Sequence, residues 1–573
     1  MKSFRNLILV AGSLCLAGTA SAQQLMHGEL LGRIEDQSVT IQLIFSDSAE
    51  VRVEYGNSPG VYPSQTPWQL YSDSVPAEIQ LSGLQPDTRY YYRINHRTPG
   101  NPVSTVRPEY TFHTSRPNNA GFTFVVQADP HLDNQSDTAT YARCLLNQLE
   151  DQPDFMIDLG DNVMTDKLKN SLNVITRDTI IYRTRLLRSY YERVNHSVPL
   201  FLTLGNHEGE AGWLLNGTPN NVAVWNTLER KKFYLNPSPD GFYTGDTTNH
   251  PYVGRRENYY AWTWGDALFI VLDPYWYTSP KPDSLHGWNW TLGFTQYEWL
   301  RTTLQQSQAT YKFVFSHQLV GGDPDGRGGV EFADRYEWGG DNLDGTPGFS
   351  VNRPGWYKPI KELLEENRVT IFFHGHDHFF AKQDLDCLVY QECPQPGHIN
   401  FNSANQAPVY GYFQGQILPN SGHLRVTVDS SGVRVDYVRA YKAADETATR
   451  HNKDISATYF IGPVNCYDSI TTSVPVLWNS NYPEGRAYPN PFRENTRIEF
   501  DIKQSSKVSL MITDIHGKIV RRLLSESSVP EGTFQVSWDG VSDTGDPAPS
   551  GIYIYTLTIN GRSVKTGKLI LER

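Results

Sequence analysis

The sequence has few of the features that mark membrane proteins and polyanion-binding proteins. Beyond the first 22 residues it contains no apolar run close to the roughly 20 residues that a membrane-spanning helix needs. Basic residues number 50 against 62 acidic ones, for a formal net charge of −12, which argues against a nucleic-acid-binding surface. The length of 573 residues exceeds what one hydrophobic core supports and predicts about three or four domains.

Cysteine is also rare, with 5 residues in the whole chain. Cys15 lies in the first 22 residues, which leaves Cys144, Cys387, Cys393 and Cys466. Four is an even number, as expected for disulfides in an exported protein. Cys387 and Cys393 are close enough in sequence to bridge a hairpin, and buried free thiols are an equally good interpretation.

Residues 1–22 have the pattern of a secretory signal peptide. Two basic residues, Lys2 and Arg5, precede an apolar stretch from Leu7 to Ala17, and Ala20-Ser21-Ala22 offers small residues for cleavage before Gln23. We therefore expect an exported protein without a transmembrane segment.

Residues 24–115 show the short, alternating pattern of a β-sandwich. Val51, Val53 and Tyr55 fall on one face of an expected strand, and Pro86-Asp87 marks a turn. The stretch Leu84-Gln85-Pro86-Asp87-Thr88-Arg89-Tyr90-Tyr91-Tyr92 resembles a fibronectin type III module, of the kind that precedes the catalytic domain of purple acid phosphatases.

Residues 120–460 alternate apolar runs with helical patterns, which predicts an α/β layered domain. Tyr141, Leu145 and Leu149, for example, have helical spacing. Residues 209–290 interrupt this alternation with many aromatic residues, including several tryptophans. Such a cluster is typical of core beneath long loops, and a wall of a substrate cleft is the alternative interpretation.

Several apolar runs in this segment end at residues that can bind metal ions. Runs of this length are typical of buried parallel strands, and ligands of such sheets lie at the carboxyl ends of the strands. A pair of metal ions needs one bridging carboxylate and separate imidazole, carboxylate and amide ligands. A further run, from Ala267 to Asp273, ends at a carboxylate without a second candidate beside it. The candidate metal ligands are Asp129, His131, Asp161, Asn206, His317, His376 and His378.

The motifs around these residues resemble the signature blocks of the calcineurin-like metallophosphoesterase superfamily. In chain order they are Asp129-Pro130-His131, Gly160-Asp161-Asn162, Gly205-Asn206-His207-Glu208, Ser316-His317 and Gly375-His376-Asp377-His378. The resemblance implies that the first metal ion binds Asp129, His131, Asp161 and His378, and that the second binds Asp161, Asn206, His317 and His376. Asp161 is then the bridge. We expect the glycine before Asp161, Asn206 and His376 to let the backbone turn sharply.

The resemblance also gives roles to two residues that bind no metal. It places His207 opposite the scissile phosphate, as a proton donor or as a hydrogen bond to the transition state. Arg327 lies in a glycine-rich segment after His317 and is our candidate for gripping a phosphate oxygen, with an exposed loop arginine as the alternative.

The neighbours of the ligands are expected either to orient the imidazoles or to be solvated loop residues. These neighbours are Asn162, Glu208 and Asp377. His374 is expected to be a structural residue at a strand end rather than a ligand.

The chain departs from purple acid phosphatases at two positions. His131 stands where those enzymes carry glycine, and Met164 stands where they carry a metal-bound tyrosine. Without a tyrosinate we expect no charge-transfer colour. The motifs match the Asp-x-His branch of the superfamily instead, so the predicted cofactor is a pair of divalent or trivalent ions of Fe, Zn or Mn.

The expected reaction is hydrolysis of a phosphate ester by in-line attack of a metal-bridging hydroxide, without a covalent enzyme intermediate. The combination of sandwich and phosphatase motifs favours monoesters, on a small molecule or an extracellular substrate. A phosphodiesterase or nucleotidase acting on nucleotides or phospholipid head groups is the alternative enzyme. A catalytically inactive binding protein at the cell surface is the alternative outside the enzymes, and the complete ligand set argues against it.

Residues 461–485 form a loop-rich linker, and residues 486–573 return to strand patterns, including one with Ile552 and Ile554 on one face. Motifs such as Tyr488-Pro489-Asn490-Pro491-Phe492 and Trp538-Asp539-Gly540 resemble the type A C-terminal sorting domain of type IX secretion cargo. The resemblance implies type IX secretion machinery as a partner and a location in the medium or on the surface of a Gram-negative bacterium. An immunoglobulin-like structural spacer is the alternative.

Overall fold

The computed structural model describes residues 25–322, 326–463, 486–502, 505–514, 518–559 and 562–572. The predicted signal peptide, most of the predicted linker and Cys466 lie outside the described residues. The chain divides into two compact units, Met1–Ser469 and Ile470–Arg573, and each is described by itself below.

The N-terminal part of the first unit is a β-sandwich. One sheet has the order β1-β2-β6 and the other the order β4-β3-β7-β8, with β5 paired to β3 and β9 paired to β7. Val51 and Val53 of β3 are buried between the sheets, as the alternating pattern predicted. The strands are β1 (Leu25–Gly32), β2 (Ser38–Phe45), β3 (Ala49–Gly56), β4 (Ser64–Gln65), β5 (Gln69–Tyr71), β6 (Ala77–Ser82), β7 (Arg89–Arg97), β8 (Thr105–Val106) and β9 (Tyr110–His113).

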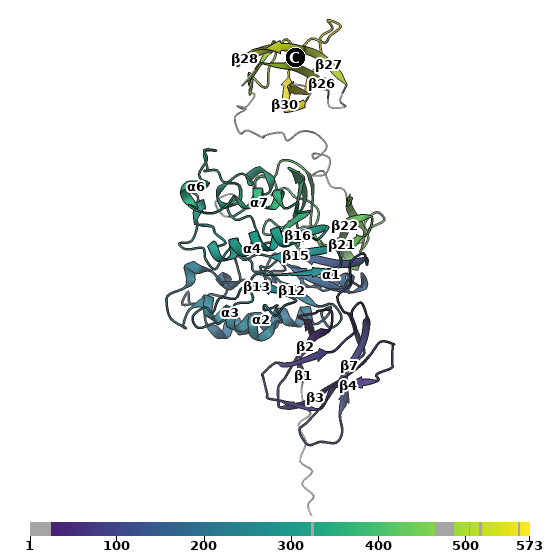
Figure 1. The fold of residues 1–573 in the computed structure, drawn as a ribbon. Coiled ribbons are helices and arrows are strands. Elements are labelled where there is room, and N and C mark those ends of the chain that lie inside the picture. The colour runs from purple at the N-terminus through teal and green to yellow at the C-terminus, as the bar shows by residue number, and fades with distance from the viewer. Residues whose placement is uncertain are drawn as a thin grey trace, which may run out of the picture. The chain divides into compact units, whose positions relative to one another are not determined.

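The second part of this unit contains two larger sheets (Figure 1). The first has the order β12-β11-β10-β21-β22-β23, in which β10, β11 and β12 are parallel. Its strands are β10 (Phe122–Gln127), β11 (Phe155–Asp158), β12 (Leu200–Leu202), β21 (Gly422–Asp429), β22 (Gly432–Arg439) and β23 (Ile455–Ile461).

The second sheet has the order β13-β14-β15-β16-β17-β19-β18-β20, and β15, β16, β17 and β19 are parallel. Its strands are β13 (Thr244–Gly245), β14 (Tyr260–Trp264), β15 (Ala267–Val271), β16 (Tyr311–Phe315), β17 (Ile371–His374), β18 (Phe380–Leu385), β19 (Leu388–Glu392) and β20 (Gln416–Leu418).

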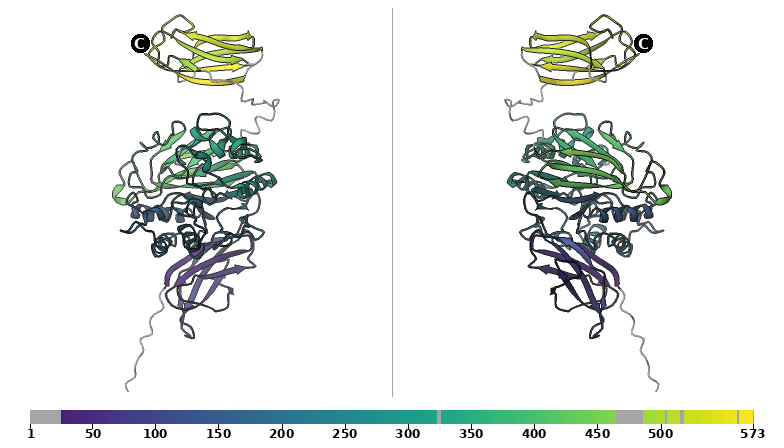
Figure 2. Two further views of the ribbon diagram at one scale, coloured as in Figure 1. Left: turned by 90° about the vertical axis from the view of Figure 1, so that its left-hand side faces the viewer. Right: turned by 90° about the vertical axis from the view of Figure 1, so that its right-hand side faces the viewer.

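Side chains alternate between the two faces of each strand, and this alternation builds the layers. Phe124 of β10 meets Phe269 of β15 with ring centroids 5.2 Å apart, so the two sheets face each other across an aromatic core. Val125, the next residue of β10, points to the opposite face and packs under helices α1 and α2. In Figure 2 the helices between residues 138 and 191, drawn in blue, lie outside the strands.

Helices cover the outer faces of both sheets, which confirms the predicted α/β layered sandwich. Helices α1 (Thr138–Glu150) and α2 (Arg177–Tyr191) pack on the first sheet. Helices α4 (Phe294–Gln306) and α7 (Ile360–Glu366) pack on the second. The remaining helices are α3 (Val222–Phe233), α5 (Tyr336–Gly339) and α6 (Phe349–Asn352), with 3₁₀ turns η1 (Thr165–Lys167), η2 (Gly212–Leu214), η3 (Gly287–Asn289), η4 (Val330–Phe332) and η5 (Ala443–Asp445).

The cysteines do not form the hairpin disulfide that their spacing allowed. Cys144 and Cys393 are free and buried, and Cys387 is disulfide-bonded. Because both other described cysteines are free, neither of them is the partner of Cys387.

The second unit is an immunoglobulin-like β-sandwich, as expected. Its core contains Trp538, and Tyr553 and Tyr555 of β29 point into it. Ile552 and Ile554 share one face of β29, as predicted, and they are 48% and 36% exposed, so this face points away from the core. The sheets are β24-β25-β28 and β27-β26-β29-β30, with strands β24 (Arg486–Tyr488), β25 (Thr496–Ile502), β26 (Ser506–Asp514), β27 (Ile519–Val529), β28 (Gly532–Trp538), β29 (Gly551–Ile559) and β30 (Arg562–Leu571).

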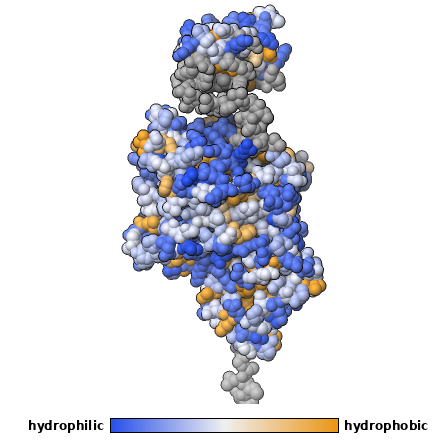
Figure 3. Space-filling view, in the orientation of Figure 1, coloured by the Kyte–Doolittle hydropathy of each residue, from blue (hydrophilic) through white to orange (hydrophobic). Residues whose placement is uncertain are grey.

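The face of the molecule drawn in Figure 3 is mainly hydrophilic. On this face, hydrophobic residues occur in small, separate groups among hydrophilic ones. Among the described residues, no helix has the length and apolar character needed to cross a membrane.

A buried arginine joins the N-terminal sandwich to the layered domain. Arg188 of α2 is fully buried and donates to the carbonyl oxygens of Gly28 (3.1 Å), Gln42 (3.0 Å) and Phe233 (2.5 Å). It also donates to the side-chain oxygen of Gln42. Burial lowers the pKa of Arg188 to about 10, so its guanidinium stays charged at neutral pH. These bonds hold strands β1 and β2 against α2.

We expect Arg188→Ala to lower the free energy of unfolding by about 3 kcal/mol, because several buried acceptors lose their donor. Denaturation of the purified protein measures the change. Arg193→Ala, an exposed arginine two residues beyond α2, is the matched control and should change little. Equal effects of the two substitutions would contradict this role of Arg188.

Candidate metal centre

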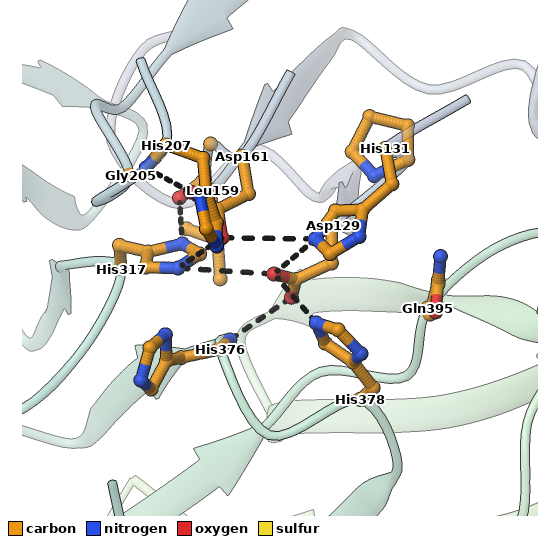
Figure 4. Close-up of polar contacts among 12 residues, drawn as sticks. Asp129, His131, Leu159, Asp161, Gly205, His207, His317, His376, His378 and Gln395 are labelled. Carbon is orange, nitrogen blue, oxygen red and sulfur yellow. Dashed lines mark hydrogen bonds and ion pairs between the residues drawn. The ribbon is translucent and has the colours of Figure 1, made fainter. Parts of the chain in front are cut away.

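The predicted ligands follow the carboxyl ends of strands from both large sheets. Asp129 and His131 follow β10, Asp161 follows β11 and Asn206 follows β12. His317 follows β16 of the second sheet, while His376 and His378 follow β17. The carboxyl ends of strands from the two sheets therefore meet in one place. Figure 4 shows the side chains that lie together there: Asp129, His131, Asp161, His317, His376 and His378.

The first ligand group consists of Asp129, His131 and His378. The Oδ1 atom of Asp129 lies 3.6 Å from Nε2 of His131 and 3.4 Å from Nε2 of His378. In Figure 4 the Asp129 carboxylate lies between these imidazoles. One cation could bind all three side chains at this point.

The second group consists of Asp161, His317 and His376. The Oδ2 atom of Asp161 lies 3.2 Å from Nε2 of His317 and 3.6 Å from Nε2 of His131, which belongs to the first group. Asp161 thus stands between the two groups, in the position that a bridging ligand requires. Asn206 borders the same cleft as His376.

Unsatisfied polar atoms show that this centre fits metal ions. Five buried atoms of the candidate ligand side chains have no hydrogen-bond partner among the described residues, although buried polar groups are nearly always paired. The Nδ1 atom of His317 lies 2.9 Å from the carbonyl oxygen of Leu159, so that Nδ1 donates and Nε2 keeps a free lone pair. The five atoms are Asp129 Oδ1, both ring nitrogens of His131, Asn206 Oδ1 and His317 Nε2.

The electrostatics of the centre also favour bound cations. Burial raises the pKa of Asp129 and Asp161, yet the neighbouring histidines outweigh burial and hold both pKa values below the usual range. Burial likewise lowers the pKa of His131, but the carboxylates around it raise that pKa well above its usual value. The carboxylates thus stabilise positive charge between them, which metal ions would supply.

Several ligands have a strained backbone. Asp129, Asp161 and His376 have φ angles of 58°, 59° and 81°, in the left-handed region that non-glycine residues rarely adopt. His131 and His378 are left-handed as well. Such strain costs of order 1–3 kcal/mol per residue and persists where the surrounding structure enforces it, as at functional sites.

The glycines of the motifs have two different roles. Gly160 has a φ of 101° and makes the expected turn. Gly205 does not need a positive φ. A Cβ atom there would lie 2.3 Å from Oδ1 of Asp161, so glycine is required by the close approach of the two loops. Glycine is required at position 375 for the same reason, since a Cβ atom there would lie 2.7 Å from Oδ2 of Asp129. At these two positions glycine is required by close packing rather than by a positive φ.

Glu208 ties the loops after β11 and β12 together, which differs from both roles expected for it. Its buried carboxylate accepts from the backbone N–H groups of Asp161 (2.9 Å), Val163 (3.3 Å), Asn162 and Gly205. Burial, followed by the Asp161 charge, raises the pKa of Glu208 to about 7. Bound metal ions would favour its charged form.

His207 has a partner that the sequence did not predict. Its Nδ1 atom lies 2.5 Å from Oδ1 of Asp166, and its Nε2 atom lies 3.9 Å from Oδ2 of Asp161. Burial lowers the pKa of His207, but Asp161 and Asp166 outweigh burial and raise it. Asp166 therefore orients the ring and favours the imidazolium.

Arg327 lies at the edge of the same cleft and is held there by Asp377. Its Nη1 atom donates to Oδ1 of Asp377 (2.7 Å) and to the carbonyl oxygen of His376 (3.2 Å), and its guanidinium lies 4.1 Å from the ring centroid of Tyr410. Asp377 is buried and also accepts from the Tyr412 hydroxyl at 2.9 Å. Asp377 thus positions an arginine rather than an imidazole.

The other expected neighbours are structural. Asn162 is buried, and its side-chain oxygen accepts from the Tyr191 hydroxyl at 3.0 Å. His374 is the last residue of β17, and its Nδ1 atom lies 2.8 Å from a Glu392 oxygen. Asp273, at the end of the run without a second ligand, pairs with Arg256 at 2.7 Å.

Comparison with known proteins identifies the layered domain. Residues 122–380 match the calcineurin-like phosphoesterase family, and residues 491–563 match the FlgD Ig-like domain. Residues 122–380 form a calcineurin-like metallophosphoesterase domain. A search of curated proteins gives no match to the chain.

Two solved structures share the fold of this chain over most of its length. Purple acid phosphatase PPD1 from yellow lupin (Lupinus luteus) seeds is 15% identical, with a TM-score of 0.52 over 79% of this chain and 78% of that one. The structure of PhoD is 15% identical, with a TM-score of 0.54 over 81% of this chain and 95% of that one. At such low identity these likenesses show the fold alone.

We expect Glu208→Gln to weaken metal binding about 10- to 100-fold. The glutamine amide has one N–H₂ group in place of a carboxylate oxygen, so it would place a donor opposite the backbone N–H groups that Glu208 now accepts from. Titration of the metal-free protein with Mn²⁺ or Zn²⁺ measures the change. Glu362→Gln, an exposed residue of α7, is the control. Unchanged metal affinity in Glu208→Gln would rule out this positioning role.

Proposed function

We propose that this metallophosphoesterase hydrolyses phosphate monoesters with a pair of metal ions. The two ligand groups on either side of Asp161, with their unpaired buried ligand atoms, are the observation that carries the proposal. Asp129, His131 and His378 would hold one ion, Asn206, His317 and His376 the other, and Asp161 both. The donor set suits Fe, Zn or Mn.

Bound metal ions would supply positive charge to the phosphoryl oxygens and lower the pKa of a bound water. The protein's own side chains complete the site. His207 borders the cleft beside Asn206, where its proton can reach the leaving oxygen. Arg327 borders the cleft beside His376, where its guanidinium can bind a phosphate oxygen.

The preference for monoesters is part of the proposal. It is supported by the β-sandwich that precedes the metallophosphoesterase domain, because its sequence resembles the module that precedes the catalytic domain of purple acid phosphatases. A phosphodiesterase acting on nucleotides or phospholipid head groups is the second candidate, because the cleft extends well beyond the ligands. The complete ligand set argues against an inactive binding protein.

Purified protein reconstituted with Mn²⁺ or Zn²⁺ should bind two ions and hydrolyse an aryl phosphate such as 4-nitrophenyl phosphate. Asp161→Ala should abolish turnover and reduce metal content at both positions, since Asp161 faces both groups, whereas His131→Ala should weaken mainly one. Elemental analysis and initial rates measure these effects.

Equal, partial metal loss in Asp161→Ala and His131→Ala would contradict the bridging assignment. Fewer than one bound ion per chain, without turnover, would favour the binding protein over the enzyme.

His207→Ala should keep both metal ions and lose about two to four orders of magnitude in kcat. Asp166→Asn should lower kcat about tenfold. It should also move the high-pH limb of the rate profile to lower pH. Protonated His207 is lost as the pH rises through its pKa, and removing the Asp166 charge lowers that pKa. Asp178→Asn, an exposed residue of α2, is the control. Metal loss in His207→Ala would show that His207 is a ligand.

We further propose that residues 486–573 act as a sorting domain for type IX secretion and that the enzyme works outside the cell. The FlgD Ig-like match and the β-sandwich support a separate immunoglobulin-like domain. None of the seven proposed metal ligands belongs to it. A domain that supplies no metal ligand is better suited to directing secretion than to catalysis.

Truncation after Pro483 should leave phosphatase activity intact and retain the enzyme in the periplasm of a host that has type IX secretion. The full-length chain should reach the surface or the medium with this domain removed. Cell fractionation with immunoblotting measures the distribution. Identical partitioning of both chains would reduce the domain to a structural spacer.

A further inference from the structure

The cleft at the metal centre continues past the ligands. It has a volume of about 510 Å³, enough for a ligand larger than a phosphate ion. Beyond Asn206, His207 and His376, its lining includes Trp213, Trp290 and two lysines. Lys169 follows η1, and the other three residues lie in the aromatic-rich segment 209–290. None of the four belongs to the metal-ligand motifs.

Trp213 is held as a rigid, flat surface. The preceding residue, Gly212, donates its N–H to the carbonyl oxygen of Tyr275 at 3.0 Å. A Cβ atom on Gly212 would lie 2.5 Å from the carbonyl oxygen of Trp276, so this turn packs directly on the backbone of that segment. Trp290 is buried and meets Trp213 edge to face, with ring centroids 6.0 Å apart. Trp213 itself is only half-buried and remains accessible from the cleft.

Two cations border the cleft beside this ring. The Nζ atom of Lys281 lies 6.0 Å from the centroid of Trp213, and Lys169 is exposed on the lining. Among the described residues neither lysine pairs with a carboxylate, whereas Lys167, Lys361 and most other lysines of this unit do. Among the described residues of the lining, the one acid, Asp166, is paired with His207. The described lining of this cleft is therefore locally basic, although the protein as a whole is acidic, and it attracts anions.

We propose that this cleft selects phosphate monoesters whose leaving group carries a flat aromatic ring and a second anionic group, the chemistry of a nucleoside bisphosphate. The inference rests on the phosphomonoesterase function proposed above. The ring stacks on Trp213 and the second anion lies near Lys281 and Lys169.

The reaction itself is unchanged by this selection. A water oxygen bonds to phosphorus, the bond from phosphorus to the ester oxygen breaks, and that oxygen takes up a proton. Orthophosphate and the alcohol leave the cleft. An acyl chain would fill the same volume without using the planar face of Trp213, so a phospholipid substrate fits these observations less well.

Three compounds with the same primary ester test the proposal. They are ribose 5-phosphate, adenosine 5′-monophosphate and adenosine 3′,5′-bisphosphate, which add first the ring and then the second phosphate. We expect KM to fall about tenfold at the first step, near the lower end for base stacking. We expect a further fall of about threefold at the second, the size of an exposed ion pair.

Variants separate the two contacts. Trp213→Ala should bring the KM ratio of ribose 5-phosphate to adenosine 5′-monophosphate close to one, while Trp213→Phe should preserve most of that ratio. Lys281→Ala should remove the gain from the second phosphate. Lys232→Ala, an exposed lysine of α3 that does not line the cleft, is the matched control and should change neither ratio.

Equal KM values for the three compounds in the unaltered enzyme would overturn the proposal, as would a Trp213→Ala variant that keeps the full ratio. Hydrolysis of 4-nitrophenyl phosphate without hydrolysis of any of the three would overturn the inference alone. If none of the four is hydrolysed, the proposed function fails separately. Calorimetric titration of the metal-loaded protein with the same compounds then decides the inference. A Kd that falls along the series supports it, and equal values or no binding contradict it.

Discussion

The close approach of the backbone at Gly160–Asp161 to the backbone at Leu204–Gly205 is the constraint on which the metal centre depends. A Cβ on Gly160 would lie 2.4 Å from the nitrogen of Gly205, so the two loops are in direct contact. Their N–H groups converge on one buried carboxylate, that of Glu208. This arrangement places Asp161 at the meeting point of both ligand groups and leaves Asn206 and His207 facing the cleft.

The remaining ligands arrive from the other sheet, and the aromatic core between the sheets fixes their position. Phe315 and Phe373, near the ends of β16 and β17, stack with centroids 5.0 Å apart. Two residues after Phe315 comes His317, and three after Phe373 comes His376. A close-packed core of this kind allows little movement, which explains how left-handed ligand residues can persist.

The sequence predicted the parallel strands that lead to the candidate ligands, because each apolar run and the polar residue at its end are local in the chain. An apolar run of strand length that ends at Asp, Asn or His can be recognised without knowing which distant residues pack against it. The sequence could not predict that the strands divide between two sheets, since buried parallel strands look alike. Asp166 was missed because an exposed aspartate in a turn has no pattern, and only the fold brings it to His207. In β29 both faces are apolar, so alternation could not choose between Ile552 and Tyr553.

The central claim is that Asp161 bridges two metal ions, and anomalous X-ray diffraction from crystals grown with Mn²⁺ or Zn²⁺ tests it most directly. Two anomalous peaks are expected in the cleft. One should be bound by Asp129, His131 and His378, the other by Asn206, His317 and His376, with Asp161 contacting both. A single peak, or a second peak beyond reach of Asp161 while the Asn206 oxygen stays unbound, would contradict it.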